Sequence, residues 1–341
     1  MKKLLTILFV VVALVSFSLT VIDDIGRVVT FETSVNRVIC AAPSISDFIS
    51  NLNLKGKVVG VTDWDTSIGN EISYTVKKGD TLYSIMQKFG YSDARLNEIK
   101  KANNLKNNSL KIGMKLKLPL AEKIGNMVPL NIEKIVSLNP DVVFLTGGFQ
   151  EPEVKKLEKY GIKAFVINPT SFNEILRDVS VIGTILGKSK EAEKLSSSLR
   201  AKVISIAKSN SNKKNKPRVM YAMVSNNVST IWTAGTGSFT NEMIAYAGGL
   251  NLVAPYTGNN GWLSVGPEFV VNENPDAIIV PSYYPGDTSS KDKLMSAEQF
   301  KDVNAIKNGK IILIDGNKAS QASPSLINVL EDLNKKIGEL N

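Results

Sequence analysis

The three tryptophans of the chain lie in or beside predicted loops, where an indole ring can bind a ligand. Trp64 stands between two aspartates, Trp262 follows an Asn-Asn-Gly turn, and Trp232 precedes a Thr-Ala-Gly segment. A loop tryptophan offers a large, rigid surface on which a flat or bulky ligand can stack, although the same ring can simply pack the loop against the core. We therefore take all three as candidates for binding a ligand rather than for catalysis.

Tyrosines add to this candidate set. Tyr283 and Tyr284 follow a predicted buried strand, where they could contribute to a binding surface or equally pack against the strand end. Tyr256 is a further candidate. Cys40 ends the β-prone run Val38-Ile39-Cys40 and is interpreted as a core residue.

The composition excludes many kinds of chemistry. The 341 residues include no histidine and a single cysteine. The Ser-His-Asp and Cys-His triads, the HExxH zinc proteases, histidine-rich metal sites and internal disulfides are therefore excluded. We expect no catalytic residues, no resident metal and no cofactor.

Two glutamates occupy equivalent positions near the starts of predicted helices. Glu133 and Glu268 each precede an Asn-Pro-Asp sequence, and the proline follows the glutamate by seven residues in both cases. A carboxylate in the first helical turn offsets the helix dipole by about 0.3–1 kcal/mol, which is sufficient to explain either residue on its own.

The chain begins with a secretory pattern. Lys2 and Lys3 precede the apolar run from Leu4 to Val15, which is short for a membrane span but typical of a signal-peptide core. Small residues allow cleavage after Ser18 or Thr20, and an uncleaved anchor is the alternative. In either case we expect the remainder to lie outside the cytoplasm.

One short segment carries nearly all of the excess positive charge. The formal net charge is +9, and residues 74–119 contribute +7 of it, whereas the rest of the mature chain is neutral. This distribution argues against nucleic-acid binding and favours contact with anions of a cell wall or membrane surface, or simply a solvated lysine-rich face.

The same segment predicts a separate β-α-α-β unit. A strand at 74–76 leads through Lys78-Gly79-Asp80 into a helix that Asp80 or Thr81 can cap, a second short helix follows, and 116–119 returns as a strand. The sequence YTVKKGDTLYSIMQKFG with the later Leu-Lys-Ile-Gly-Met-Lys-Leu closely resembles the LysM domain. The resemblance implies binding to N-acetylglucosamine chains of peptidoglycan by two loops, namely Gly79, Asp80, Thr81 and Leu82 with Leu110, Lys111 and Ile112.

The remaining chain contains an internal repeat. The two Glu-x6-Pro-Asp elements are one repeated pair, and Arg37-Val38-Ile39 and Arg218-Val219-Met220 are another. The spacings of the two pairs differ by 46 residues, which is the length of 74–119. This predicts two similar α/β lobes, the first of them interrupted. Between them, Ser171-x-x-Glu174 begins a long helical stretch that Gly187 breaks and Ser189 restarts.

In this arrangement the chain resembles the cobalamin, ferric-siderophore and haem class of ABC-transporter substrate-binding proteins. The resemblance rests on the order of the opening Val-Ile-Asp-Asp-Ile-Gly-Arg at 21–27, Ala-Pro-Ser-Ile-Ser-Asp at 42–47, Val-Val-Gly-Val-Thr at 58–62, both Pro-Asp elements and Ala-Ser-Pro at 322–324. It implies two Rossmann-like lobes joined by one long helix, with the ligand in the cleft between them. It also implies that the three tryptophans lie at the cleft and that Glu133 and Glu268 pair with permease arginines.

Two departures from the family pattern affect the interpretation. The LysM unit occupies the loop after Val-Gly-Val-Thr, near the expected mouth of the cleft. Residues 317–321, Asn-Lys-Ala-Ser-Gln, replace the aromatic and acidic pair typical of cobalamin binders, which weakens a cobalamin assignment. The absence of histidine disfavours a divalent-metal importer, whereas haem stays open because tyrosine can ligate iron.

The sequence therefore predicts a monomeric, periplasmic or wall-associated receptor for a metal chelate that partners an ABC permease and ATPase. Two alternatives stay open, namely a peptidoglycan-active glycosidase using paired carboxylates and a wall-attached protein without transport. The expected domains are a signal peptide at 1–20, an N-terminal lobe at 21–73 and 120–168, the LysM insert at 74–119, a connecting helix and linker at 169–216, and a C-terminal lobe at 217–341.

Overall fold

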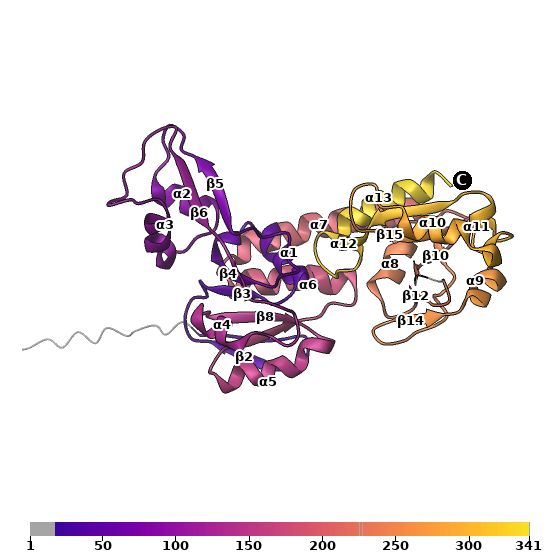
Figure 1. Ribbon diagram of the computed structural model, residues 1–341, viewed down its shortest axis with the longest axis horizontal. Coiled ribbons are helices and arrows are strands. Elements are labelled where there is room, and N and C mark those ends of the chain that lie inside the picture. The colour runs from indigo at the N-terminus through magenta and orange to yellow at the C-terminus, as the bar shows by residue number, and fades with distance from the viewer. Residues whose placement is uncertain (1–17, 225, 227, 341) are drawn as a thin grey trace, which may run out of the picture.

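Short runs of valine and isoleucine form the central strands of two parallel sheets, because β-branched residues pack well on a pleated, buried surface. The computed structural model describes residues 18–340 apart from 225 and 227. It consists of two α/β lobes, here called the N-lobe and the C-lobe, a helical pair that joins them, and a small insert that projects from the N-lobe (Figure 1). The predicted fold class is confirmed.

The N-lobe is built on a five-stranded parallel sheet in the order β7-β4-β3-β8-β9. Its strands are β3 (Val38–Cys40), β4 (Val58–Val61), β7 (Glu122–Lys123), β8 (Val142–Thr146) and β9 (Ala164–Ile167). All strands begin at one edge, here called the N-terminal edge, and end at the opposite C-terminal edge. In such sheets ligands bind beyond the C-terminal edge.

Helices cover both faces of this sheet. One face packs on α1 (Pro43–Asn51) and α6 (Phe172–Ile185), and the other on α4 (Ile132–Ser137) and α5 (Glu151–Lys159). Two single-turn 3-10 helices, η1 (Lys55–Lys57) and η3 (Gly148–Gln150), precede β4 and follow β8. Cys40 is fully buried in β3, which agrees with its predicted core position.

The chain enters the N-lobe through a hairpin of β1 (Leu19–Ile22) and β2 (Val28–Phe31), which is fastened beside β9. Asp24 N donates to Val166 O at 3.1 Å. The predicted signal-peptide core lies outside the described residues. The two predicted cleavage sites lie at the start of this hairpin, because Leu19 and Thr20 already belong to β1. Cleavage after Ser18 would keep β1 whole, whereas cleavage after Thr20 would remove half of it. Within the described residues no helix is both long and apolar enough to cross a bilayer.

The C-lobe has a four-stranded parallel sheet in the order β13-β10-β15-β16. Its strands are β10 (Arg218–Tyr221), β13 (Leu250–Asn251), β15 (Ala277–Ser282) and β16 (Ile311–Asp315). One face packs on α8 (Phe239–Tyr246) and α13 (Leu326–Gly338), with α12 (Gly316–Ala319) beside them. The other face packs on α9 (Pro267–Glu273), α10 (Ser289–Ser296), η4 (Glu298–Phe300) and α11 (Asn304–Lys307).

A second, antiparallel sheet extends the C-lobe. It consists of β11 (Met223–Val224), β12 (Ile231–Ala234) and β14 (Trp262–Val265) in the order β11-β12-β14. Because β11 follows β10 almost directly, this small sheet continues from the C-terminal end of a parallel strand. It is therefore positioned where a ligand-binding surface is expected.

The predicted internal repeat is present in the hydrogen bonding of the two lobes. Asp141 N donates to Arg37 O at 2.8 Å, and Asp276 N donates to Arg218 O at the same distance. In return, the Asp141 carboxylate accepts from Arg37 N and the Asp276 carboxylate accepts from Arg218 N, both at 2.8 Å. The central strands of the two lobes therefore begin with the same pair of hydrogen bonds between an aspartate and an arginine backbone.

The helical stretch between the lobes forms two helices, α6 and α7 (Ser189–Ser211), as the sequence predicts. Ser171 Oγ accepts from Glu174 N and caps α6, and Gly187, with a φ of 71°, ends the segment between them. Residues of α6 and α7 belong to the same apolar core as both lobes. A direct polar link joins the lobes as well, because the Asp47 carboxylate accepts from Ser325 N at 2.8 Å.

The insert has the predicted β-α-α-β order. It comprises β5 (Glu71–Thr75), α2 (Leu82–Lys88), η2 (Asp93–Arg95), α3 (Leu96–Ala102) and β6 (Lys115–Pro119), with β5 and β6 antiparallel. Thr81 caps α2 in a capping box with Ser84, and Gly90, with a φ of 76°, follows its end. Strand pairing runs from Glu71 to Pro119, so the hairpin begins three residues before the predicted boundary.

The expected position of the insert at the mouth of the cleft is wrong. The insert folds back from the end of β4 and packs on the N-terminal edge of the N-lobe sheet. Gly56 N donates to Phe89 O at 2.9 Å, and an added Cβ at Gly56 would meet the Tyr91 ring at 2.5 Å. Because Gly56 precedes β4 whereas Trp64 follows it, the insert and the predicted cleft lie at opposite ends of this strand.

Candidate functional site

Trp64 is held outward by a firmly bonded turn beyond the C-terminal edge of the N-lobe sheet. Its side chain is 67% exposed. The buried Asp65 carboxylate accepts from Ser67 N at 2.7 Å, and Lys123 Nζ donates to Thr62 O at 3.1 Å and Asp65 O at 2.6 Å. The loop is therefore fixed while its indole ring stays in solvent, as a preorganised binding surface requires.

On the C-lobe, Trp232 lies in an exposed row across the small antiparallel sheet. It pairs with Met223 on one side and with Ser264 on the other, and directly opposite residues share a face of the sheet. Tyr283 Oη lies 4.0 Å from Met223 Sδ, so Tyr283 extends this row. Burial raises the pKa of Tyr283, and the nearby Asp287 raises it further. Two of the predicted aromatics thus form one surface.

Trp262 lies on the same face of this sheet but is more enclosed. Its ring packs edge-on against Tyr221 at 5.8 Å and against Phe239 at 6.0 Å between centroids. The Tyr221 hydroxyl is buried without a hydrogen-bond partner in the part of the chain that is described, and burial raises its pKa. Trp262 therefore lies next to the row on the same face and exposes only part of its ring.

The other two predicted tyrosines are placed differently. The Tyr256 ring packs on Phe269 of α9 at 5.6 Å, edge to face. Phe269 belongs to the core beneath the opposite face of the small sheet, so the structure does not bring Tyr256 together with Trp232. Tyr284 follows β15 and is strongly exposed.

On the N-lobe, sequence reasoning missed an exposed aromatic residue beyond a strand end. Phe149 is 60% exposed in η3, directly after the central strand β8. Gln150, which is fully buried, fixes this turn by donating to Ala41 O at 2.8 Å and accepting from Thr146 N at 2.9 Å. The Thr-Gly-Gly-Phe sequence after an apolar run was the available signal.

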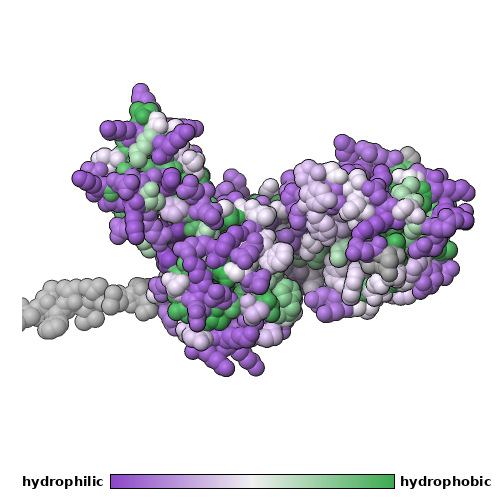
Figure 2. All heavy atoms as spheres, in the orientation of Figure 1, coloured by the Kyte–Doolittle hydropathy of each residue, from purple (hydrophilic) through white to green (hydrophobic). Residues whose placement is uncertain are grey.

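Figure 2 shows a hollow between the two lobes on the side presented.

The two predicted docking glutamates lie at equivalent points of the lobes. Glu133 and Glu268 are exposed in the first turns of α4 and α9, the helices that lead into the central strands β8 and β15. Asn131 already caps α4 by accepting from Lys134 N at 3.0 Å, so Glu133 is not needed as a cap. The Glu268 carboxylate folds back over Gly266, where an added Cβ would lie 2.2 Å from it.

In the insert, the two predicted glycan-binding loops lie side by side. Gly113 N donates to Val76 O at 2.8 Å and Val76 N donates to Met114 O at 2.9 Å, which joins the loop at 77–81 to the loop at 110–113. Gly79 and Lys111 are exposed, as is Ile112 at 71%. These loops therefore offer backbone groups and one apolar side chain on a common surface.

Two of the predicted glycan contacts have structural roles. The Asp80 carboxylate accepts from Lys77 N at 2.7 Å and from Tyr74 Oη at 2.8 Å, and these bonds lower its pKa. Leu82 is fully buried in the core of the insert, and Leu110 is half-buried. Thr81 is exposed beside Tyr83, an exposed ring that sequence reasoning missed.

A buried arginine fastens the insert to the N-lobe. Arg95, which is 2% exposed, donates to Gly56 O at 2.8 Å, Val58 O at 3.0 Å and Leu120 O at 3.0 Å. Its Nε donates to the Glu98 carboxylate at 2.8 Å. Glu98 in turn accepts from Arg37 of the N-lobe at 2.7 Å. The insert is therefore part of a continuous structure rather than a tethered module.

Two parallel-sheet lobes that share one core with a connecting helical pair, and that carry aromatic residues beyond their strand ends, define a two-lobed solute-binding protein. The chain belongs to the periplasmic binding protein family, which matches residues 97–317. Residues 74–119 match the LysM domain, with the boundaries that the sequence predicts.

Similar proteins come from bacteria and archaea. The chain is 26% identical to an uncharacterized ABC transporter substrate-binding lipoprotein of Bacillus subtilis, over 94% of this chain and 86% of that one. It is 21% identical to a cobalamin-binding protein of Halobacterium salinarum, over 92% and 72%. An ABC-type Fe3+-hydroxamate transport protein structure from Saccharomonospora viridis has a TM-score of 0.65 at 19% identity, over 94% and 99%.

Proposed function

We propose that this chain is the extracytoplasmic substrate-binding protein of an ABC importer for a metal chelate, namely a ferric siderophore, cobalamin or haem. The observation that carries the proposal is the exposed row of Trp232, Met223 and Tyr283 on the C-lobe, together with the fixed, exposed Trp64 on the N-lobe. Such rings suit a large ligand with flat or apolar faces. The protein acts by capture and release, without catalysis.

The similar proteins and one residue near Tyr283 bear on the choice among these ligands. The relative from Halobacterium favours cobalamin, whereas the fold neighbour from Saccharomonospora favours a siderophore. At the position where cobalamin binders carry an aromatic and acidic pair, Asn317 Nδ2 donates to Tyr283 O at 2.9 Å and offers an amide instead. We therefore place cobalamin behind a ferric siderophore, and haem stays in the proposal.

We further propose that the insert retains the protein at the cell wall. The Bacillus subtilis relative is described as a lipoprotein, but the single cysteine of this chain is buried in β3 and cannot carry a lipid. The LysM insert supplies another means of retention, because its loops offer backbone groups to N-acetyl groups and its lysines attract wall anions.

The importer proposal is tested by fluorescence titration. A bound metal chelate should quench tryptophan emission strongly when ferric siderophores, cobalamin or haem are added in turn. Trp232→Ala should weaken binding at least tenfold, because it removes the centre of the aromatic row. Tyr160→Ala is the matched control, since Tyr160 is an exposed aromatic residue like Trp232 but lies at the C-terminal end of α5. No quenching and no thermal shift with any of the three ligands would overturn the proposal.

A further inference from the structure

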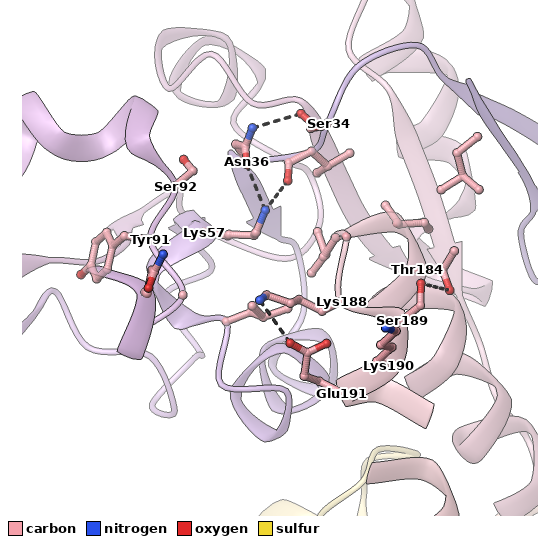
Figure 3. Close-up of a pocket in the computed structure, with 18 residues that line it drawn as sticks. Ser34, Asn36, Lys57, Tyr91, Ser92, Thr184, Lys188, Ser189, Lys190 and Glu191 are labelled. Carbon is pink, nitrogen blue, oxygen red and sulfur yellow. Dashed lines mark hydrogen bonds and ion pairs between the residues drawn. The ribbon is translucent and has the colours of Figure 1, made fainter. Parts of the chain in front are cut away.

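A second cavity lies at the opposite edge of the N-lobe from Trp64. It has a volume of about 900 Å³, is open to solvent on one side and is lined by three parts of the molecule (Figure 3). These are the N-terminal edge of the N-lobe at Asn36 and Lys57, the insert at 87–92, and the α6–α7 junction at 184–191. Its position separates it from the aromatic residues discussed above. It is of the size that small-molecule sites usually have.

A buried ammonium group faces this cavity. Lys57 is 9% exposed, and its Nζ donates to Val35 O at 2.6 Å and to Asn36 Oδ1 at 3.0 Å. Both acceptors are neutral, and Lys57 has no ion-pair partner within the described residues. Burial, reinforced by the charge of Lys188, lowers the pKa of Lys57 to about 8. A buried cation without a counter-ion is costly, so an anion at this point would be favoured.

The start of α7 adds further positive charge. Lys188 and Lys190 line the cavity, and Lys188 occupies the N-cap position of this 23-residue helix without a side-chain capping bond. Glu191 is the one carboxylate of the first turn, and it pairs with Lys188 at 3.2 Å. The other nearby acid, Asp141, has a carboxylate that accepts from Arg37 N. The ammonium groups of Lys57 and Lys190 therefore remain available to a ligand.

Neutral polar side chains share the remaining wall with apolar ones, namely Leu19, Val35, Leu54, Ile185 and Leu186. Ser34, Asn36, Gln87, Ser92 and Ser189 line the cavity. Ser92 Oγ is buried and has no hydrogen-bond partner within the described residues. Hydroxyl and amide groups in this number suit the hydroxyls of a sugar, and the volume exceeds what a bare phosphate ion needs.

We propose that this cavity binds a sugar that carries an oxyanion, either a phosphate or a carboxylate. The oxyanion contacts Lys57 and Lys190, with Lys188 adding to the positive charge of the wall, and the sugar hydroxyls contact the serine and amide side chains. Because the walls come from the insert, the N-lobe and the α6–α7 junction, bound ligand stabilises the contact among all three. This site is separate from the chelate cleft and does not depend on the proposed transport function.

The test compares charged and neutral sugars at constant ionic strength by calorimetry on the purified protein. The probes are glucose 6-phosphate and glucuronic acid, each compared with glucose, which lacks the N-acetyl group that the LysM loops are proposed to bind. We expect one or both charged sugars to bind at least tenfold more tightly than their neutral counterparts. The phosphate and carboxylate arms identify the oxyanion.

Matched double variants locate the site. Lys188→Ala with Lys190→Ala should weaken binding of the charged sugar at least tenfold. Lys194→Ala with Lys208→Ala removes the same charge from exposed positions of α7 outside the cavity and should have no effect.

Three outcomes would overturn the proposal. They are equal affinity for charged and neutral sugars, equal loss in both double variants, and loss of binding on Trp64→Ala. Lys57→Gln is titrated with the same probes. A loss of affinity that persists at high salt indicates a direct contact through Lys57, because general charge attraction falls with added salt.

Discussion

The guanidinium of Arg95 is buried at the joint between the insert and the N-lobe, where it replaces water by backbone carbonyl oxygens and the Glu98 carboxylate. Arg95→Met keeps much of the side-chain length but leaves those carbonyls without a donor. We expect the free energy of unfolding to fall by about 3 kcal/mol, because one partner of a buried charged network is removed.

Urea denaturation measures this loss, and Lys101→Met on the exposed side of α3 is the control. A loss as small as that of the control would mean that water reaches the carbonyls and that the contact between insert and lobe opens readily.

Asp178 is a second residue whose burial has a measurable consequence. Burial, and then the neighbouring Asp24 charge, raise its pKa to about 8, and one of its oxygens has no partner within the described residues. The folded protein therefore keeps a proton that the unfolded chain releases near pH 4. Because the folded state binds more protons, its stability falls as the pH rises from about 4 to about 8.

Asp178→Asn should remove this part of the pH dependence, so that the variant gains thermal stability relative to the parent protein at pH 8 more than at pH 5. Thermal melts at both pH values measure the difference. The exposed substitution Asp302→Asn should leave the slope unchanged. A parent-like slope in Asp178→Asn would assign the ionisation elsewhere.

At the scale of elements, local signals explain what the sequence could predict. Ser171 and Thr81 cap helices, Gly90 and Gly187 follow their ends, and the repeated Asn-Pro-Asp begins each central strand. Each signal acts within a few residues of the element that it defines. The order of the insert and the two lobes could therefore be predicted from the chain itself.

The position of the insert could not be predicted in this way. The acceptors of Arg95 are backbone oxygens of Gly56, Val58 and Leu120, and a carbonyl leaves no mark on the sequence. Tyr256 is a second example. The sequence groups it with the cleft aromatics, whereas in the structure its ring packs on α9. The face to which a loop side chain turns depends on tertiary contacts.

Removing the insert tests its role as an element. Because Glu71 and Pro119 are paired, a short Gly-Ser bridge can replace residues 71–119. We expect the lobes to fold and keep their ligand affinity within a few-fold, but with a lower melting temperature, since Leu54 and Leu120 lose their cover. Binding to purified peptidoglycan in a pelleting assay should be lost.

Wall binding that survives the deletion would place the adhesive surface elsewhere. A large loss of ligand affinity would connect the insert to the cleft despite their separation. Chemical denaturation of the shortened chain, compared with Arg95→Met, shows how much of the stability loss comes from this one side chain.

At the scale of the whole molecule, Glu133 and Glu268 place an exposed carboxylate at the start of the equivalent helix in each lobe. Replacing both with arginine puts repulsion where we propose attraction to permease arginines. Uptake should fall more than tenfold while ligand affinity is unchanged, because both residues lie on outer helices. Glu193→Arg, on the exposed side of α7, is the control. Uptake that stays normal in the double variant would leave these residues a role at helix starts alone.

The fixed contact between the insert and the N-lobe has a kinetic consequence. Because Gly56 and Arg95 hold the insert against the sheet, the joint does not swivel, and a copy bound to the wall keeps one orientation while the glycan contact lasts. On the proposal that the insert retains the protein at the wall and that a permease receives its ligand, a copy must leave the wall before it can reach a permease that faces another way. We then expect the dissociation rate of the LysM contact to limit how often each copy reaches the membrane, so that a brief, weak contact serves import better than a tight one.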